Sequence, residues 1–246
     1  GAGAVTRTAQ SKMRETVSVL DFGADPTGAT DSSAAVQAAI ASGAGTIYFP
    51  TGSYQFSITL GPVTTPPNFV GDGIFKTNFY KTSPTGTIIA QQQTNVQWAM
   101  WEIRGISFGG FPSFNTANNQ GTAILFGTIP YSAGAEYAGV CRISQCSFGD
   151  FENAIYKAYG NIGNVIEYCN FLNCDYHYRI DSLNPGGSPM QPGNDTLYKN
   201  HFSYARLASF YMDTGSGGVI ECRDNIWENM EGFAVFVRIT NATAFY

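Results

Sequence analysis

Glu152 and Asp175 are the first candidates for acid–base chemistry. Each lies four residues after a phenylalanine, and Arg206 lies four residues after the next phenylalanine of the same series. If these phenylalanines repeat one position of a stacked strand structure, the three residues form a column with about 4.8 Å between neighbours. Hydrolysis of a glycosidic bond requires two carboxyl groups about 5 to 9.5 Å apart, and like charges that close raise the pKa of one of them. We therefore predict a catalytic pair, Glu152 and Asp175, with Arg206 beside it as a substrate-binding residue; the alternative is a solvent-exposed charge ladder at a turn.

A second group follows Asp175 directly along the chain. Strand alternation would place Asp175, His177, Arg179 and Asp181 on one face. Such a face could do acid–base work, and His177 and Asp181 join the catalytic candidates. Elimination at a sugar acid requires a base and a cation that neutralises the carboxylate, roles that His177 or Tyr178 with Arg179 could fill. The alternative is an outer strand whose polar side faces water.

The third group is the segment from Trp227 to Phe233, which combines an aromatic ring with carboxylates. A flat indole is a good platform for the apolar face of a sugar ring, so Trp227 and Glu228 are predicted to bind substrate. Tryptophan is also enriched where protein surfaces pack together, so Trp227 could equally pack between coils or between subunits.

The elements that would position these groups are indicated by an internal repeat. Five similar segments end at Phe108, Phe148, Phe171, Phe202 and Ile226, with a basic period near 23 residues and insertions. A coil of about that length suits a parallel β-helix, in which equivalent residues stack about 4.8 Å apart. We expect interior ladders of Phe148, Phe171 and Phe202 and of Cys146 and Cys169.

Composition supports an all-β class and excludes several functions. Charged residues make up 13% of the 246 residues, and the 28 glycines and 14% aromatic residues suit short strands joined by tight turns. With a net charge of -5 and no run of Lys and Arg, we expect no nucleic-acid partner. No apolar stretch is long enough for membrane insertion.

Cysteine usage and motif absences argue against a metal or cofactor. The five cysteines include no Cys-x-x-Cys pair, so we expect small buried hydrophobes and no zinc site. The sequence shows no acidic calcium cluster and no Walker loop. We predict no metal and no cofactor.

The chain reads as one main domain after a leader. We expect a leader or linker over residues 1–16, the opening of a β-helix with a capping helix over 17–56, and coils over 57–246. Within the opening, Val17–Leu20 is predicted to be a strand and Ser32–Ser42 the helix. The abrupt end of the sequence is typical of a fragment, whose active site would be incomplete.

The opening resembles known proteins. The segment from Ala4 to Ala24 resembles the start of the β-helix in bacteriophage tailspikes, and Asp25–Asp31, the following helix and Thr46–Tyr54 are similar to the opening of the pectate-lyase-like superfamily. One departure is Asp31-Ser32, where many relatives have two aspartates.

This resemblance implies a right-handed parallel β-helix in a homotrimer on a phage tail, attached to other tail proteins through its N-terminal side. It implies that the protein is made in the host cytoplasm, belongs to the virion and acts at the bacterial surface. The implied partner is host capsular polysaccharide or O-antigen, bound in a lateral groove.

We expect the reaction to be hydrolysis of that polysaccharide. The alternatives are a lyase on the same scaffold and a non-catalytic receptor-binding or structural tail segment. A plant-type pectinase is disfavoured, because its Asn-Thr-Asp, Asp-Asp and Gly-His-Gly set does not occur.

Overall fold

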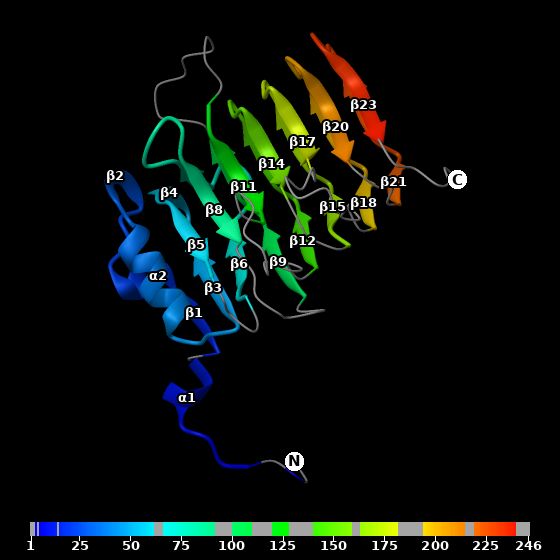
Figure 1. Cartoon of the computed structure of the whole chain (residues 1–246). Coiled ribbons are helices and arrows are strands. Elements are labelled where there is room, and N and C mark those ends of the chain that lie inside the picture. Colours follow the sequence, from blue (N-terminus) through cyan, green and yellow to red (C-terminus); the bar gives the residue numbers. More distant parts are fainter. Residues whose placement is uncertain are drawn as a thin grey trace.

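The chain folds into a right-handed parallel β-helix, here described by a computed structural model (Figure 1). The described residues are 3, 5–13, 15–61, 66–91, 100–109, 120–127, 140–158, 163–181, 194–214 and 219–239. Residues 240–246, at the sequence end that suggested a fragment, lie outside this set. The predicted all-β class and β-helix architecture are confirmed.

Three parallel sheets run along the solenoid, and each coil from β3 onward adds one strand to each sheet, whereas the first coil contributes β1, β2 and the helix α2. Sheet A contains β1 (Thr16–Ser18), β3 (Thr46–Phe49), β6 (Asn68–Gly71), β9 (Trp101–Arg104), β12 (Cys141–Ser144), β15 (Val165–Glu167), β18 (Asp195–Tyr198) and β21 (Ile220–Arg223). Sheet B contains β2 (Thr27–Asp31), β4 (Gly52–Gln55), β7 (Thr77–Tyr80), β10 (Ser107–Gly109), β13 (Ser147–Gly149), β16 (Asn170–Leu172), β19 (His201–Ser203) and β22 (Ile226–Glu228). Sheet C contains β5 (Ile58–Leu60), β8 (Thr87–Gln91), β11 (Thr122–Phe126), β14 (Asn153–Lys157), β17 (Tyr176–Asp181), β20 (Ala208–Thr214) and β23 (Phe233–Ile239).

A ladder of aromatic rings fills the interior beside sheet B. Phe108, Phe148, Phe171 and Phe202 are in register on successive coils, with ring centroids 4.8, 4.9 and 4.8 Å apart. Trp227 continues the ladder 5.4 Å beyond Phe202. The predicted phenylalanine ladder is therefore confirmed, and the stacked rings fix the register of each coil on the next.

The cysteines are free thiols, and four of the five are buried. Cys146 and Cys169 occupy equivalent positions, and each Sγ lies near the backbone carbonyl of an isoleucine on the preceding coil. Cys222 is exposed, unlike the buried hydrophobe that was expected.

In the four coils from β12 to β23, two corners have a backbone conformation with positive φ. Between sheets B and C this position is held by Asp150, Asn173, Tyr204 and Asn229, with φ of 64°, 51°, 55° and 52°. The equivalent corner between sheets A and B recurs with the same period. Aspartate and asparagine tolerate this conformation better than other side-chain-bearing residues.

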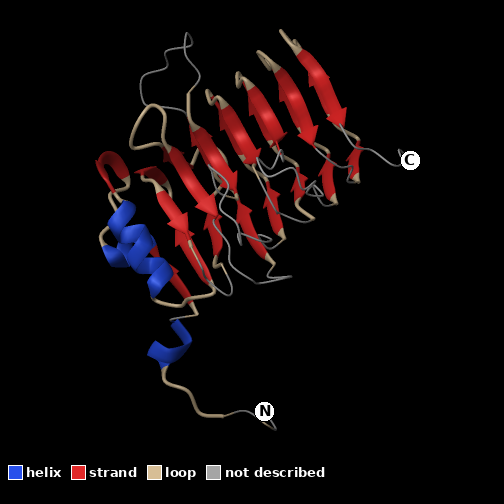
Figure 2. Cartoon of the chain, viewed as in Figure 1, coloured by secondary structure: helices blue, strands red, loops and turns tan. Residues whose placement is uncertain are grey.

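A helix covers the N-terminal end of the solenoid. Helix α2 (Ser33–Ala41) packs Val36 and Ala39 against the first coils, and its position ahead of β5 shields the end of the core (Figure 2). The short helix α1 (Ala9–Met13) precedes β1. The predicted strand over Val17–Leu20 is wrong in its second half, because Ser18 caps a 3-10 helix over Val19–Phe22. Neither α-helix is long and apolar enough to cross a membrane.

Candidate functional site

The outer face of sheet C carries an aromatic column interrupted by one arginine. Tyr156, Arg179, Tyr211 and Phe236 are in register on β14, β17, β20 and β23. The rings of Tyr211 and Phe236 stack at 5.0 Å, and Tyr176 meets Tyr211 edge to face at 5.2 Å. Aromatic rings thus occur on this face in four successive coils, at Tyr156, Tyr176, Tyr211 and Phe236.

The Arg179 guanidinium is held within this column. Its central carbon lies 4.8 Å from the ring of Tyr156, 4.9 Å from that of Tyr176 and 5.7 Å from that of Tyr211. Such contacts are attractive because the face of an aromatic ring carries partial negative charge. Burial among these groups raises the pKa of Tyr156, although the charge of Arg179 acts in the opposite direction.

Two carboxylates contact the same guanidinium. Arg179 lies 3.1 Å from Asp181 on its own strand and 3.8 Å from Glu152 on the preceding coil. The side chain of Glu152 is 47% exposed and that of Asp181 is 25% exposed, so both can meet solvent. Three of the residues predicted from the sequence, Glu152, Arg179 and Asp181, therefore come together.

Asp213 is a further carboxylate that the sequence analysis did not identify. It pairs in register with Asp181 on the neighbouring coil, and its Oδ2 accepts a hydrogen bond of 3.2 Å from the Tyr211 hydroxyl. Asp213 occupies in its strand the position that Asp181 occupies in β17, so an alignment of the strands on the coil repeat was the signal that could have found it.

The predicted column of Glu152, Asp175 and Arg206 exists. The backbone amide of Asp175 donates to the Phe151 carbonyl, which places Asp175 opposite Glu152. In the same way, the amide of Arg206 donates to the Cys174 carbonyl, which places Arg206 opposite Asp175. Asp175 is only 15% exposed and forms an ion pair of 3.1 Å with Arg206. The two proposed partners thus have different neighbours, because Glu152 contacts Arg179.

The prediction that His177 lies on the outer face is wrong, as is the use of Tyr178 there. Both side chains point into the interior and are at most 1% exposed. The equivalent residues on neighbouring strands of sheet C, Ala123, Ala154 and Ser209, are also fully buried. In these strands two consecutive residues point inward, which interrupts the alternation on which the prediction rested.

His177 packs as part of the core. Its ring centroid lies 5.7 Å from those of both Phe171 and Phe202, and its Nδ1 lies 3.0 Å from Ser209 Oγ. Burial lowers the pKa of His177 to about 3. The imidazole is therefore neutral near pH 7 and does not meet substrate.

A buried ion pair near the end of β14 is a second feature that the sequence did not predict. Lys157 Nζ lies 2.8 Å from Asp195 Oδ2, which also accepts a hydrogen bond of 2.7 Å from the Tyr178 hydroxyl. Asp195 Oδ1 accepts from the Asn164 amide at 2.8 Å. Burial raises the pKa of Tyr178 well above its usual value.

Trp227 and Glu228 lie away from this cluster. Trp227 stacks in the interior ladder, in agreement with packing between coils rather than with an outer sugar platform. Glu228 lies 2.9 Å from His201 Nε2 on sheet B. Across the described ranges, no three His, Cys, Asp or Glu side chains are grouped so that they could hold a metal ion.

Comparison with known proteins agrees with the architecture. Residues 16–121 match the family described as Rhamnogalacturonase A/epimerase, pectate lyase-like. The chain is 36% identical over 83 residues to Alpha-1,3-galactosidase A of Peterkaempfera griseoplana, a match that covers 31% of this chain and 11% of that protein. The match therefore spans about a tenth of that relative's length.

Two solved structures share the fold. The A-module of the mannuronan C-5 epimerase AlgE6 from Azotobacter vinelandii matches with a TM-score of 0.51 and 16% identity, over 90% of this chain and 72% of that one. The catalytic unit of a GH87 alpha-1,3-glucanase from Streptomyces thermodiastaticus matches with a TM-score of 0.52 and 15% identity, over 93% and 43%. The predicted resemblance is confirmed at this level: the chain has the pectate-lyase-like right-handed parallel β-helix fold.

Proposed function

We propose that this chain binds a polysaccharide along the outer face of sheet C and hydrolyses it with Glu152 and Asp181. The observation that carries this proposal is the contact of both carboxylates with one guanidinium, that of Arg179, within an aromatic column. Two carboxyl groups on one guanidinium are compatible with the spacing of about 5 to 9.5 Å that glycoside hydrolysis uses.

We assign a role to each carboxyl group from its surroundings. Asp181, with the closer ion pair to Arg179, serves as the carboxylate. It acts at the anomeric carbon as a nucleophile at the shorter spacing, or as the base for a water molecule at the longer one. Glu152 lies farther from Arg179 and is more exposed, so we assign it the role of general acid for the leaving glycosidic oxygen.

The aromatic column provides the binding surface for the sugars. Tyr176, Tyr211 and Phe236 offer flat rings on three successive coils, so an extended polymer can lie along the solenoid. The tyrosine hydroxyls add polar contacts to an apolar ring, which suits the mixed surface of a pyranose. The sequence match to a galactosidase and to a pectate-lyase-like family supports a glycosidic bond as the target.

The lyase alternative is less favoured, because the residues proposed as its base do not lie on the outer face. His177 and Tyr178 lie inside the coil, and the cation Arg179 is already in contact with two carboxylates. Hydrolysis needs neither an interior base nor a free cation, so it fits this face better.

The biological setting of the proposal is a phage tailspike. Its support is the resemblance of the N-terminal segment to tailspike β-helix openings. In this setting the chain is part of the virion, acts as a homotrimer on host capsule or O-antigen, and contacts other tail proteins through its N-terminal side. Light scattering at micromolar concentration should give three times the chain mass of 26.5 kDa; a monomer would contradict the trimer.

The function is tested by incubating the protein with a panel of purified capsules, O-antigens and neutral glucans and galactans. Chain length and the ultraviolet absorbance of unsaturated sugar ends are followed together. Hydrolysis shortens a polymer without new absorbance. Shortening with absorbance would show a lyase instead, and binding without shortening would show a receptor-binding module.

A further inference from the structure

The corner between sheets A and B holds an unusual tyrosine. The backbone there adopts positive φ in successive coils, at Gly105, Gln145, Tyr168, Lys199 and Asp224, with φ of 70°, 52°, 53°, 51° and 55°. A bulky side chain is disfavoured in this conformation, because Cβ crowds the following carbonyl oxygen. Tyr168 is nevertheless found there, with 49% of its surface exposed.

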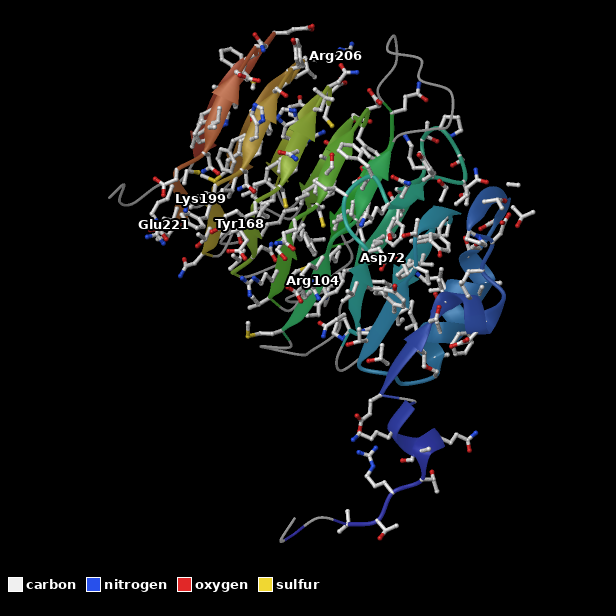
Figure 3. The ribbon with its side chains drawn as sticks, turned by 180° about the vertical axis from the view of Figure 1, so that it is seen from behind. Asp72, Arg104, Tyr168, Lys199, Arg206 and Glu221 are labelled. Atoms are coloured by element: carbon white, nitrogen blue, oxygen red, sulfur yellow. The ribbon has the colours of Figure 1, made fainter. Side chains whose placement is uncertain are left out.

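A second ring and an ammonium group surround Tyr168. The ring of Tyr198, on the next coil, meets it edge to face at 5.7 Å. Lys199 Nζ lies 5.8 Å from the centroid of Tyr168 and 5.0 Å from that of Tyr198. Figure 3 shows Tyr168 and Lys199 together on one edge of the solenoid, with Arg206 on the opposite edge.

The ammonium group of Lys199 has no carboxylate partner among the described side chains at ion-pair distance. Two arginines of sheet A do have such partners: Arg142 pairs with Glu167, and Arg223 pairs with Glu221 at 2.9 Å. A hydrogen bond with Tyr198 raises the pKa of Lys199, so the group stays charged. This corner thus offers an exposed ring beside an available positive charge.

We propose that Tyr168, Tyr198 and Lys199 form a second polysaccharide-binding site, which takes a sugar residue bearing an anionic group. The sugar ring packs against Tyr168, and its acidic group contacts Lys199. The exposure of the Tyr168 ring supports this assignment, because its edge-to-face contact with Tyr198 holds it beside Lys199 with a face open to a sugar. The inference rests on the proposed function only for the kind of ligand, since this corner is separate from the Arg179 cluster.

The test is binding by a protein that does not cleave its ligand. The Glu152→Gln/Asp181→Asn double variant is passed over immobilised acidic capsular polysaccharides and over the same polymers after carboxyl reduction. Adding Tyr168→Asn should weaken binding to the acidic form about fivefold to tenfold. The same change should raise the thermal midpoint by about 2 to 4 °C, because asparagine suits positive φ.

Gln145→Asn is the matched control, because Gln145 occupies the same corner one coil earlier with a φ of 52°. It should stabilise the protein and leave binding unchanged. Lys199→Gln should remove the preference for acidic over reduced polymer and flatten the salt dependence.

Three results would overturn the inference: unchanged binding of Tyr168→Asn, equal binding of acidic and reduced polymer by the parent protein, or binding of neither. Failure of the wild-type protein to shorten any polymer, with the binding results intact, would overturn only the proposed hydrolysis.

Discussion

Arg179 and Asp181 are two residues apart on β17, and their side chains form an ion pair of 3.1 Å on the outer face of sheet C. The same guanidinium reaches Glu152 from the preceding coil at 3.8 Å and packs on tyrosine rings on either side. Arg179 therefore bridges two coils, and in the proposed mechanism it positions the two carboxyl groups.

The Arg179→Lys variant should keep the positive charge but lose the bridge between the two carboxylates. The ammonium group cannot bridge two carboxylates and stack on the rings as the planar guanidinium does. Arg179→Lys should therefore lower kcat about tenfold or more and shift the pH profile, with a smaller change in KM. Steady-state kinetics between pH 4 and 9 check this. An unchanged pH profile would show that Arg179 does not act through Glu152 and Asp181.

The aromatic column should contribute to binding more than to turnover. Replacing Tyr211 by alanine removes a ring that stacks on Phe236 and contacts Arg179, and should raise KM about fivefold to tenfold. Tyr211→Phe keeps the ring and loses only the hydroxyl hydrogen bond to Asp213, so its KM should stay close to that of the wild type. If the two variants behave alike, the hydroxyl rather than the ring carries the interaction.

The buried, neutral His177 should make the stability of the fold sensitive to acid. Its pKa is about 3 in the folded protein, against about 6.5 in an unfolded chain. Below pH 6.5 the unfolded chain therefore binds a proton at this histidine that the folded protein does not. The folded state is stabilised relative to the unfolded state above pH 6.5, and this advantage is lost as pH falls from 6.5 towards 3. The free energy of unfolding should decrease by about 1.4 kcal/mol per pH unit in this window from His177 alone.

Urea unfolding of His177→Gln between pH 4 and 7.5 tests that prediction, and the variant should show a shallower pH slope than the wild type. His201→Gln is the control, because the chain has only these two histidines and His201 is on the surface. Equal slopes for wild type and His177→Gln would be inconsistent with a buried neutral imidazole.

The buried pair of Lys157 and Asp195 should be costly to break from one side. Lys157→Met leaves the Asp195 carboxylate without its ammonium partner in the interior, and should lower the free energy of unfolding by about 3 to 5 kcal/mol. Adding Asp195→Asn removes the stranded charge, so the double variant should be more stable than Lys157→Met. Urea unfolding of the two single variants and the double variant measures this coupling; additive losses would show that the two groups do not interact.

Repeated large side chains made much of the fold predictable from the sequence. The spacing of Phe148, Phe171 and Phe202 set the coil register, which in turn placed Glu152, Asp175 and Arg206 in one column. Side-chain partners were not predictable, because Glu152 turns to Arg179 while Asp175 turns to Arg206.

The misplacement of His177 has a different cause. Strict alternation assumes a regular strand, whereas Ala123 and Ala154, at positions equivalent to His177, also point inward and are each followed by a second buried residue. Asp213 was missed because the aligned repeat segments form sheets A and B and leave out the strands of sheet C, where Asp213 is equivalent to Asp181.

We propose that the two carboxyl groups on Arg179 perform the chemistry, and depolymerisation rates of amide variants test this most directly. On a polymer that the wild type shortens, Glu152→Gln and Asp181→Asn should each lower kcat by about two to four orders of magnitude. Asp175→Asn, whose carboxylate is paired with Arg206, should lower it less than tenfold, and Glu102→Gln on sheet A should leave it unchanged. Full activity of either Glu152→Gln or Asp181→Asn, or a loss as large in Asp175→Asn, would contradict the account.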